Sequence, residues 1–119
     1  MLKILLIDDD PHQHELFSFY LDEKFGPNSQ FTSALTLDEA LNQLGRATFD
    51  VIFLDNRLRP FVSYTQTIDK ISALSKNCPI YLISAAREQE KLGNFRAFGI
   101  IDAIDKFDLH QAITGGLLG

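Results

Sequence analysis

The chain has 119 residues, of which 45% are hydrophobic and 23% charged, and this balance predicts one compact domain covering residues 1–119. The net charge of −5 argues against an extended surface for a phosphate backbone, so we expect no direct nucleic-acid binding. A lone Cys78 excludes an internal disulfide, and no apolar run reaches the roughly 18 residues of a membrane span, so we expect a cytoplasmic protein with no membrane segment.

The first strand and helix are predicted between residues 2 and 28. Residues 2–7 form a nearly continuous aliphatic run, which is typical of a strand covered on both faces of a parallel sheet. Asp10 followed by Pro11 indicates a helix N-terminus, because aspartate caps a helix and proline fits its first position. We expect this helix to end near residues 26–28. Its predicted inward stripe consists of Leu16, Phe19, Tyr20 and Leu21.

A second strand and helix follow directly. Residues 30–34 predict the strand, and the sequence from Thr36 to Glu39 matches a capping box. In a capping box Thr36 accepts a hydrogen bond from the third helical amide, while Glu39 reaches back to the Thr36 amide. We therefore expect a helix that begins here and closes at Gly45. Its predicted inward residues are Leu37, Ala40, Leu41 and Leu44.

The second half of the chain repeats the alternation of apolar strands and helical segments. Residues 50–54 predict a third strand, whose dense apolar core at 51–54 ends in Asp55, and a loop continues through Pro60. No hairpin signal separates the strands, so the sequence predicts an α/β fold, a doubly wound five-stranded parallel sheet with helices on both faces. The further predicted elements are a helix marked by Ile68, Ile71 and Leu74, a strand at 79–83, a helix marked by Leu92, Phe95 and Phe98 and stopped by Gly99, a strand at 100–104, and a last helix from about Phe107.

Polar side chains follow four of the predicted strands. These are the three aspartates at 8–10, then Asp55, Ser84 and Lys106. The carboxyl ends of parallel strands share one edge of the sheet, where open α/β sheets hold their ligands. Clustered carboxylates repel one another unless a hard cation relieves them, and Mg²⁺ prefers such oxygen ligands. The sequence therefore predicts a Mg²⁺ site and metal-assisted phosphoryl chemistry at this edge.

The best nucleophile in this set is Asp55, which stands alone at the end of the expected central strand. Attack by its carboxylate on a phosphoryl donor would give an acyl phosphate, with Lys106 offsetting charge and the Ser84 hydroxyl donating a hydrogen bond. Each residue also has a purely structural interpretation as a helix cap, a turn residue or a surface lysine, and Asp10 fits the cap best. The convergence of four strand ends favours the functional interpretation.

Four segments resemble the receiver domain of two-component response regulators, the CheY-like family with a flavodoxin-like fold. They are residues 4–11, 49–55, 79–85 and 99–106, which occur in the family's order and spacing. The resemblance implies a non-enzymatic phosphoprotein that receives a phosphoryl group from a histidine kinase or histidine phosphotransfer protein. The domain would then either switch partner binding or pass the phosphoryl group on, and a downstream partner would bind the surface of the fourth helix, fifth strand and fifth helix.

The resemblance also assigns roles to individual residues. The phosphoacceptor would be Asp55, with Ser84 moving toward the phosphate and Lys106 pairing with it. The implied Mg²⁺ ligands are Asp8, Asp9, Asp55 and the backbone carbonyl of Arg57. Arg57 and Arg59 flank the site and would either attract phosphate or a kinase, or lie in a solvated loop.

The sequence departs from the family pattern at three positions. Ala103 stands where an aromatic residue usually precedes the lysine, Phe107 replaces a common proline, and Pro60 comes one residue late. These departures leave the phosphorylation residues complete but put the usual switching mechanism in doubt. We hypothesise that Phe61, Tyr64 or Phe107 replaces the missing aromatic side chain, although ordinary packing is the simpler interpretation.

Two other functions are open at this point. The Asp-x-Asp spacing from Asp8 to Asp10 occurs in haloacid dehalogenase-like phosphohydrolases, but Pro11 and His12 do not continue that motif and Asp55 would have no role. A degenerate receiver that only binds partners is the other alternative.

His12 and His14 are too close in sequence to form a helical metal pair, and we expect both on the helix surface.

Overall fold

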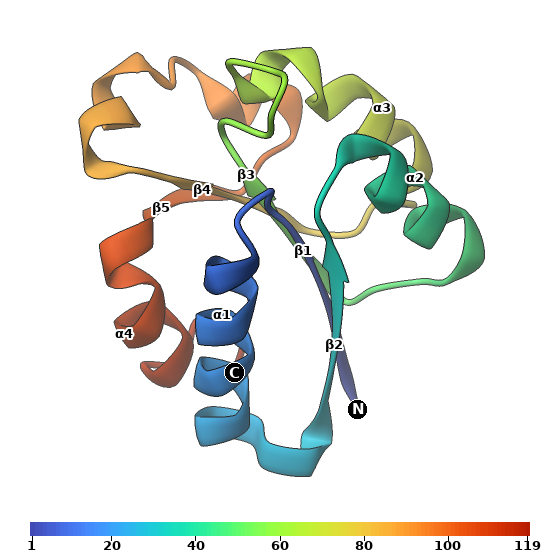
Figure 1. Ribbon diagram of the computed structural model, residues 1–119, viewed down its shortest axis with the longest axis vertical. Coiled ribbons are helices and arrows are strands. Elements are labelled where there is room, and N and C mark those ends of the chain that lie inside the picture. The colour runs from blue at the N-terminus through green and yellow to red at the C-terminus, as the bar shows by residue number, and fades with distance from the viewer.

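The computed structural model describes residues 1–119 as a five-stranded, all-parallel sheet in the order β2-β1-β3-β4-β5 (Figure 1). The predicted doubly wound α/β fold is confirmed, since the chain steps outward from β1 to β2 and then crosses to β3 on the other side. Every strand pair is parallel. The strands are β1 (Leu2–Ile7), β2 (Ser29–Ala34), β3 (Val51–Asp55), β4 (Ile80–Ser84) and β5 (Asp102–Asp105).

Helices cover both faces of the sheet. On one face lie α1 (Pro11–Phe25) and α4 (Leu109–Thr114), and on the other lie α2 (Leu37–Arg46) and α3 (Ile68–Leu74), as Figure 1 shows. Each face has its own buried cluster, because alternate residues of the central strands point to opposite sides. No helix combines the length and the apolar character that crossing a membrane requires.

The helix starts follow the local sequence signals. Asp10 accepts a hydrogen bond from the His12 amide at 3.0 Å and caps α1, and Thr36 accepts from the Glu39 amide at 3.1 Å and caps α2. Glu39 differs from the expectation, because its carboxylate accepts from the Leu35 amide rather than from Thr36. The α2 helix also runs through the predicted stop at position 45 and ends at Arg46.

The inward stripe predicted for α1 was partly wrong. Leu21 is buried as expected, but Phe19 is exposed and Phe17 is buried in its place. The predicted stripe omitted Gln13 and His14, which the structure buries on the same face as Phe17 and Leu21. These residues follow a spacing of three and four along the helix, which a search for apolar side chains alone misses.

The predicted fourth helix is absent as an α-helix. Residues Ala86–Lys91 and Phe95–Phe98 form two short 3-10 helices instead. Gly93 separates them with a backbone φ of +68°, which glycine adopts freely and which no continuous helix allows. The surface expected from the fourth helix, fifth strand and fifth helix is therefore built from these two turns, β5 and α4.

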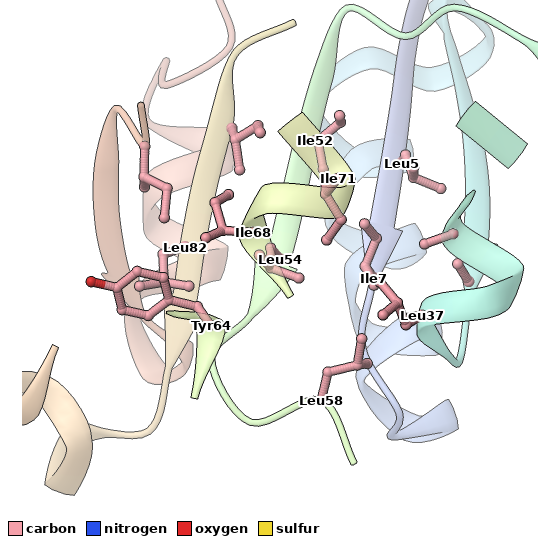
Figure 2. Close-up of a cluster of buried hydrophobic side chains, with 14 of the residues drawn as sticks. Leu5, Ile7, Leu37, Ile52, Leu54, Leu58, Tyr64, Ile68, Ile71 and Leu82 are labelled. Atoms are coloured by element: carbon pink, nitrogen blue, oxygen red, sulfur yellow. The ribbon is translucent and has the colours of Figure 1, made fainter. Parts of the chain in front are cut away.

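The loop after β3 is anchored in the core of the α2 and α3 face (Figure 2). Leu58 and Tyr64 are fully buried there among side chains such as Ile7 and Leu54. The Tyr64 hydroxyl donates a hydrogen bond of 2.6 Å to the Leu92 carbonyl, so this loop is also tied to the two turns. Residues 59–63 therefore lie between two buried side chains, Leu58 and Tyr64.

Candidate functional site

The strand register brings the predicted polar residues to one edge of the sheet. Ile7 pairs with Leu54, so Asp8 and Asp55 follow on neighbouring strands at the same level. Ser84 ends β4 next to β3, and Lys106 follows β5 directly, which places the four residues on four adjacent strands. Their spacing in the sequence is large, but parallel pairing removes that separation.

The acidic residues form one tight cluster. Carboxylate oxygens of Asp8, Asp9 and Asp55 all lie within 4.8 Å of one another. Asp8 and Asp55 are buried, whereas Asp9 is half-buried at the rim. Such a group of oxygens is repulsive when charged and is suited to a hard divalent cation.

Lys106 is the cation inside this cluster. Its Nζ lies 3.3 Å from Asp55 Oδ1 and 3.4 Å from Asp8 Oδ2. Burial acts to lower the pKa of Lys106, but the charges of Asp55 and Asp8 outweigh it and raise that pKa. The lysine is therefore charged at neutral pH and bridges the two buried carboxylates.

The two buried carboxyls are hard to ionise together. Burial, reinforced by the charge of Asp8, raises the pKa of Asp55 to about 7, although Lys106 pulls it downward. Burial also raises the pKa of Asp8 above its ordinary value. A single lysine thus does not compensate for placing both carboxylates out of water.

The cluster fits a Mg²⁺ ion by its donors. Asp8 Oδ1 already accepts from the Asp10 amide at 3.0 Å, whereas the buried Asp8 Oδ2 has no hydrogen-bond partner and only the charge of the Lys106 ammonium 3.4 Å away. A buried carboxylate oxygen without a partner is costly, and a metal ion would satisfy it. Arg57 lies two residues after Asp55 in the chain, and its backbone amide donates a hydrogen bond to Asp55 Oδ1 at 3.4 Å.

Ser84 is fully buried, and its hydroxyl is engaged by a residue that the sequence did not indicate. Gln89 Nε2 donates a hydrogen bond to Ser84 Oγ at 2.5 Å. The neighbouring Glu88 accepts from the Ala85 amide at 3.0 Å and pairs with Arg57 Nε at 3.5 Å. The turn at 86–91 therefore touches both the hydroxyl residue and the loop after β3.

His14 was wrongly predicted to lie on the helix surface. It is buried, and its Nε2 lies 2.7 Å from the Asp8 carbonyl oxygen, so Nε2 carries the proton and donates to it. This contact fixes the backbone at the start of the acidic run. The only sequence signal is helical spacing, since His14 precedes Phe17 by one turn and so shares the inward face with it and Leu21. His12, by contrast, is exposed as predicted.

The aromatic residues considered as replacements for the missing side chain lie in different settings. Tyr64 is buried with its hydroxyl bound, Phe61 is half-buried, and Phe107 is 88% exposed. Ala103 sits on β5 opposite Leu82. That one of the three takes over the role of the missing aromatic residue stays a prediction.

An open cavity of about 400 Å³ lies over the acidic cluster. Its wall carries four cationic side chains beside three carboxylates, so an anionic group entering it would meet positive charge. The cavity is lined by Asp9, Asp55, Arg57, Arg59, Pro60, Phe61, Val62, Ala85, Arg87, Glu88 and Lys106.

Three solved structures of similar fold cover nearly the whole chain. A two-component response regulator from Clostridium difficile is 22% identical with a TM-score of 0.76, and all of both chains is covered. The chemotaxis response regulator CheY4 of Vibrio cholerae is 21% identical with a TM-score of 0.74, covering 97% of this chain and 98% of its own. TrrA of Thermotoga maritima, in complex with Mg²⁺-BeF, is 23% identical with a TM-score of 0.73, covering 99% and 100%.

No curated protein matches the chain, but a family model does. The model of the response regulator receiver domain matches residues 4–114. Receiver domains are typically signalling modules that interact with histidine kinases or phosphotransfer proteins and with downstream effectors, and they bind Mg²⁺ at an acidic site. The predicted phosphoacceptor receiver function and the predicted Mg²⁺ cofactor are therefore confirmed. The chain belongs to the response regulator receiver domain family.

Proposed function

We propose that residues 1–119 form one receiver domain in which Asp55 accepts the phosphoryl group. The observation that carries this proposal is the position of Asp55, buried at the end of the central strand between Asp8 and Lys106, with Lys106 Nζ 3.3 Å from its oxygen. The cavity over the cluster gives a donor access to this carboxylate.

The transfer replaces one bond to phosphorus with another. An oxygen of the Asp55 carboxylate forms the new bond while the phosphorus–nitrogen bond of a phosphohistidine breaks. The electron pair of that bond leaves with the imidazole, which keeps the proton on its other nitrogen and departs neutral. The product is an acyl phosphate on Asp55, and the charge of the transferring oxygens is what the site must offset.

The chain's own residues divide this task. Lys106 supplies a fixed positive charge beside the accepting oxygen, and Ser84 offers the hydrogen of its hydroxyl. Asp8, Asp9 and Asp55 would hold Mg²⁺, with the Arg57 carbonyl as the further ligand that the family resemblance implies, and the ion would neutralise developing charge on the phosphoryl oxygens. The raised pKa of Asp55 fits this division, because added positive charge is what restores the ionised nucleophile.

The surface for the downstream partner can be inferred from the turn that contacts the site residues. The turn at Ala86–Lys91 contacts Ser84 through Gln89 and Arg57 through Glu88, so a change at the phosphoacceptor reaches that turn directly. We therefore assign the downstream partner to the face of the two turns, β5 and α4, and a histidine kinase or phosphotransfer protein to the cavity side. The acidic net charge favours a protein partner over nucleic acid.

The test is the intact mass of the protein after incubation with acetyl phosphate, with and without Mg²⁺. We expect one Mg²⁺-dependent phosphoryl adduct that is lost in Asp55→Asn and retained in Asp22→Asn, an exposed control on α1. No adduct on the wild type would favour a receiver that only binds partners. An adduct that survives Asp55→Asn and vanishes in Asp8→Asn would favour the phosphohydrolase.

A further inference from the structure

Arg59 makes a contact with the acidic cluster that the function above does not use. Its Nε donates to Asp9 Oδ2 at 2.5 Å, and its backbone amide donates to the same oxygen at 3.3 Å. Both donors therefore converge on one oxygen of the rim carboxylate. The Arg59 side chain itself is 81% exposed, while that of Asp9 is only 16% exposed.

The position of Pro60 makes this double contact possible. Proline has no backbone N–H, so a proline at position 59 would leave Asp9 without the amide donor and without the guanidinium. Because the proline stands at position 60 instead, Arg59 supplies both the backbone amide and the guanidinium to Asp9. Leu58 is fully buried just before it, which fixes where the Arg59 backbone meets Asp9.

The contact changes the charge that the cluster presents. The Arg59 guanidinium and the Arg59 backbone amide both donate to the Asp9 carboxylate, so the charge of Asp9 is already paired. Lys106 already balances one charge of Asp8 and Asp55. Two tethered cations thus stand against three carboxylates, and much of the negative potential available to a metal ion is already neutralised.

We propose that Arg59 is a built-in competitor of Mg²⁺ for Asp9, so that metal binding requires the guanidinium to leave the carboxylate. A carboxylate oxygen that accepts two N–H donors has little remaining capacity for a cation, and a guanidinium and Mg²⁺ close to one oxygen repel each other. The inference rests on the proposed function only through its metal site. Arg59 would set the Mg²⁺ affinity of the receiver rather than take part in the transfer.

The size of the effect follows from the exposure of the pair. An exposed ion pair is weak because water and salt screen it, so losing the competitor should tighten Mg²⁺ binding by roughly two- to fivefold. The direction is informative. A residue that merely shaped the site would weaken metal binding when removed.

The experiment is a Mg²⁺ titration of the unphosphorylated protein, followed by the chemical shifts of the backbone amides in NMR. The chain has no tryptophan, so tryptophan fluorescence cannot report the binding. We expect Arg59→Ala to tighten binding and Arg59→Lys to fall between it and the wild type. Arg87→Ala is the matched control, since Arg87 lines the same cavity but makes no ion pair. It should change the affinity less than Arg59→Ala does.

A second readout follows Arg59 itself. In the wild type, the Nε–H resonance of Arg59 should shift on adding Mg²⁺ with the same midpoint as the site amides, because the Asp9 contact is lost. An unchanged or weaker Mg²⁺ affinity in Arg59→Ala, or an equal gain in Arg87→Ala, would overturn the inference while leaving the phosphoacceptor intact. If neither the wild type nor Arg59→Ala bound Mg²⁺, the metal part of the proposed function would fail with it.

Discussion

Asp55 and Asp9 belong to one acidic cluster and each contacts a cation, yet their pKa values move in opposite directions. Asp55 has Lys106 at 3.3 Å, but burial and the charge of Asp8 raise its pKa to about 7. Asp9 has Arg59 and lies at the rim, and its pKa is lowered. The difference teaches that depth, rather than the presence of a partner, decides how costly each negative charge is here.

Removing the interior cation should have the largest effect. Lys106→Met leaves Asp8 and Asp55 without their shared partner, so we expect the free energy of unfolding at pH 8 to fall by about 2 kcal/mol without metal. The loss should be smaller at pH 5, where a proton can replace the lysine. Urea unfolding at the two pH values measures it, and an equal loss at both would contradict the electrostatic explanation.

Asp55→Asn should stabilise the fold, since it removes one of two crowded buried charges. A carboxyl whose pKa is raised in the folded state holds its proton more tightly there than in the unfolded chain. Its favourable contribution to the free energy of unfolding is therefore present below the unfolded-state pKa of about 4 and is lost as the pH rises through the folded-state pKa of about 7. We expect a gain of about 1–2 kcal/mol at pH 8 without metal and little gain at pH 5. Asp22→Asn is the exposed control and should show no such pH dependence.

The His14 contact tests the backbone beneath the cluster. His14→Leu removes the donor to the Asp8 carbonyl and should cost about 1 kcal/mol of unfolding free energy, while His14→Gln can still donate and should cost less. The Mg²⁺ affinity should weaken in the same order, because the carbonyl that His14 binds belongs to the proposed ligand Asp8 itself. Equal behaviour of the two variants would mean that packing alone accounts for the buried ring.

The smallest effect on stability is expected at the rim. Arg59→Ala should leave the urea midpoint unchanged within error, because its side chain is 81% exposed and an exposed pair contributes little to folding. The same variant should change the Mg²⁺ affinity as described above. A clear loss of stability would mean that rim and interior pairs do not differ in the way their pKa values indicate.

The sequence was sufficient for the sheet and for the edge where the polar residues gather. Continuous apolar runs marked β1, β3 and β4, and the parallel register carried Asp8, Asp55, Ser84 and Lys106 together. The contacts made by long polar side chains could not be predicted from the sequence. Neither the Gln89 contact with Ser84 nor the Arg59 contact with Asp9 leaves a periodic pattern, because each depends on where a loop folds back.

The helix that failed to form marks the other boundary. Leu92, Phe95 and Phe98 have a helical spacing, yet Gly93 with its positive φ divides the segment into two turns. Hydrophobic spacing indicates which side chains face inward but not whether the backbone between them is continuous. His14 was missed for a related reason, since a polar residue on an inward face is invisible to an apolar pattern.

The hydroxyl of Ser84 has a simple valence consequence. A hydroxyl has one hydrogen to give and two lone pairs to receive with, and Gln89 occupies only a lone pair. The hydrogen is therefore uncommitted to Gln89, and an acceptor arriving beside Ser84 can be bonded while the glutamine stays in place. One side chain atom can thus hold the turn at Ala86–Lys91 and a new anion at the same moment, so that the two become neighbours in a single hydrogen-bonded chain.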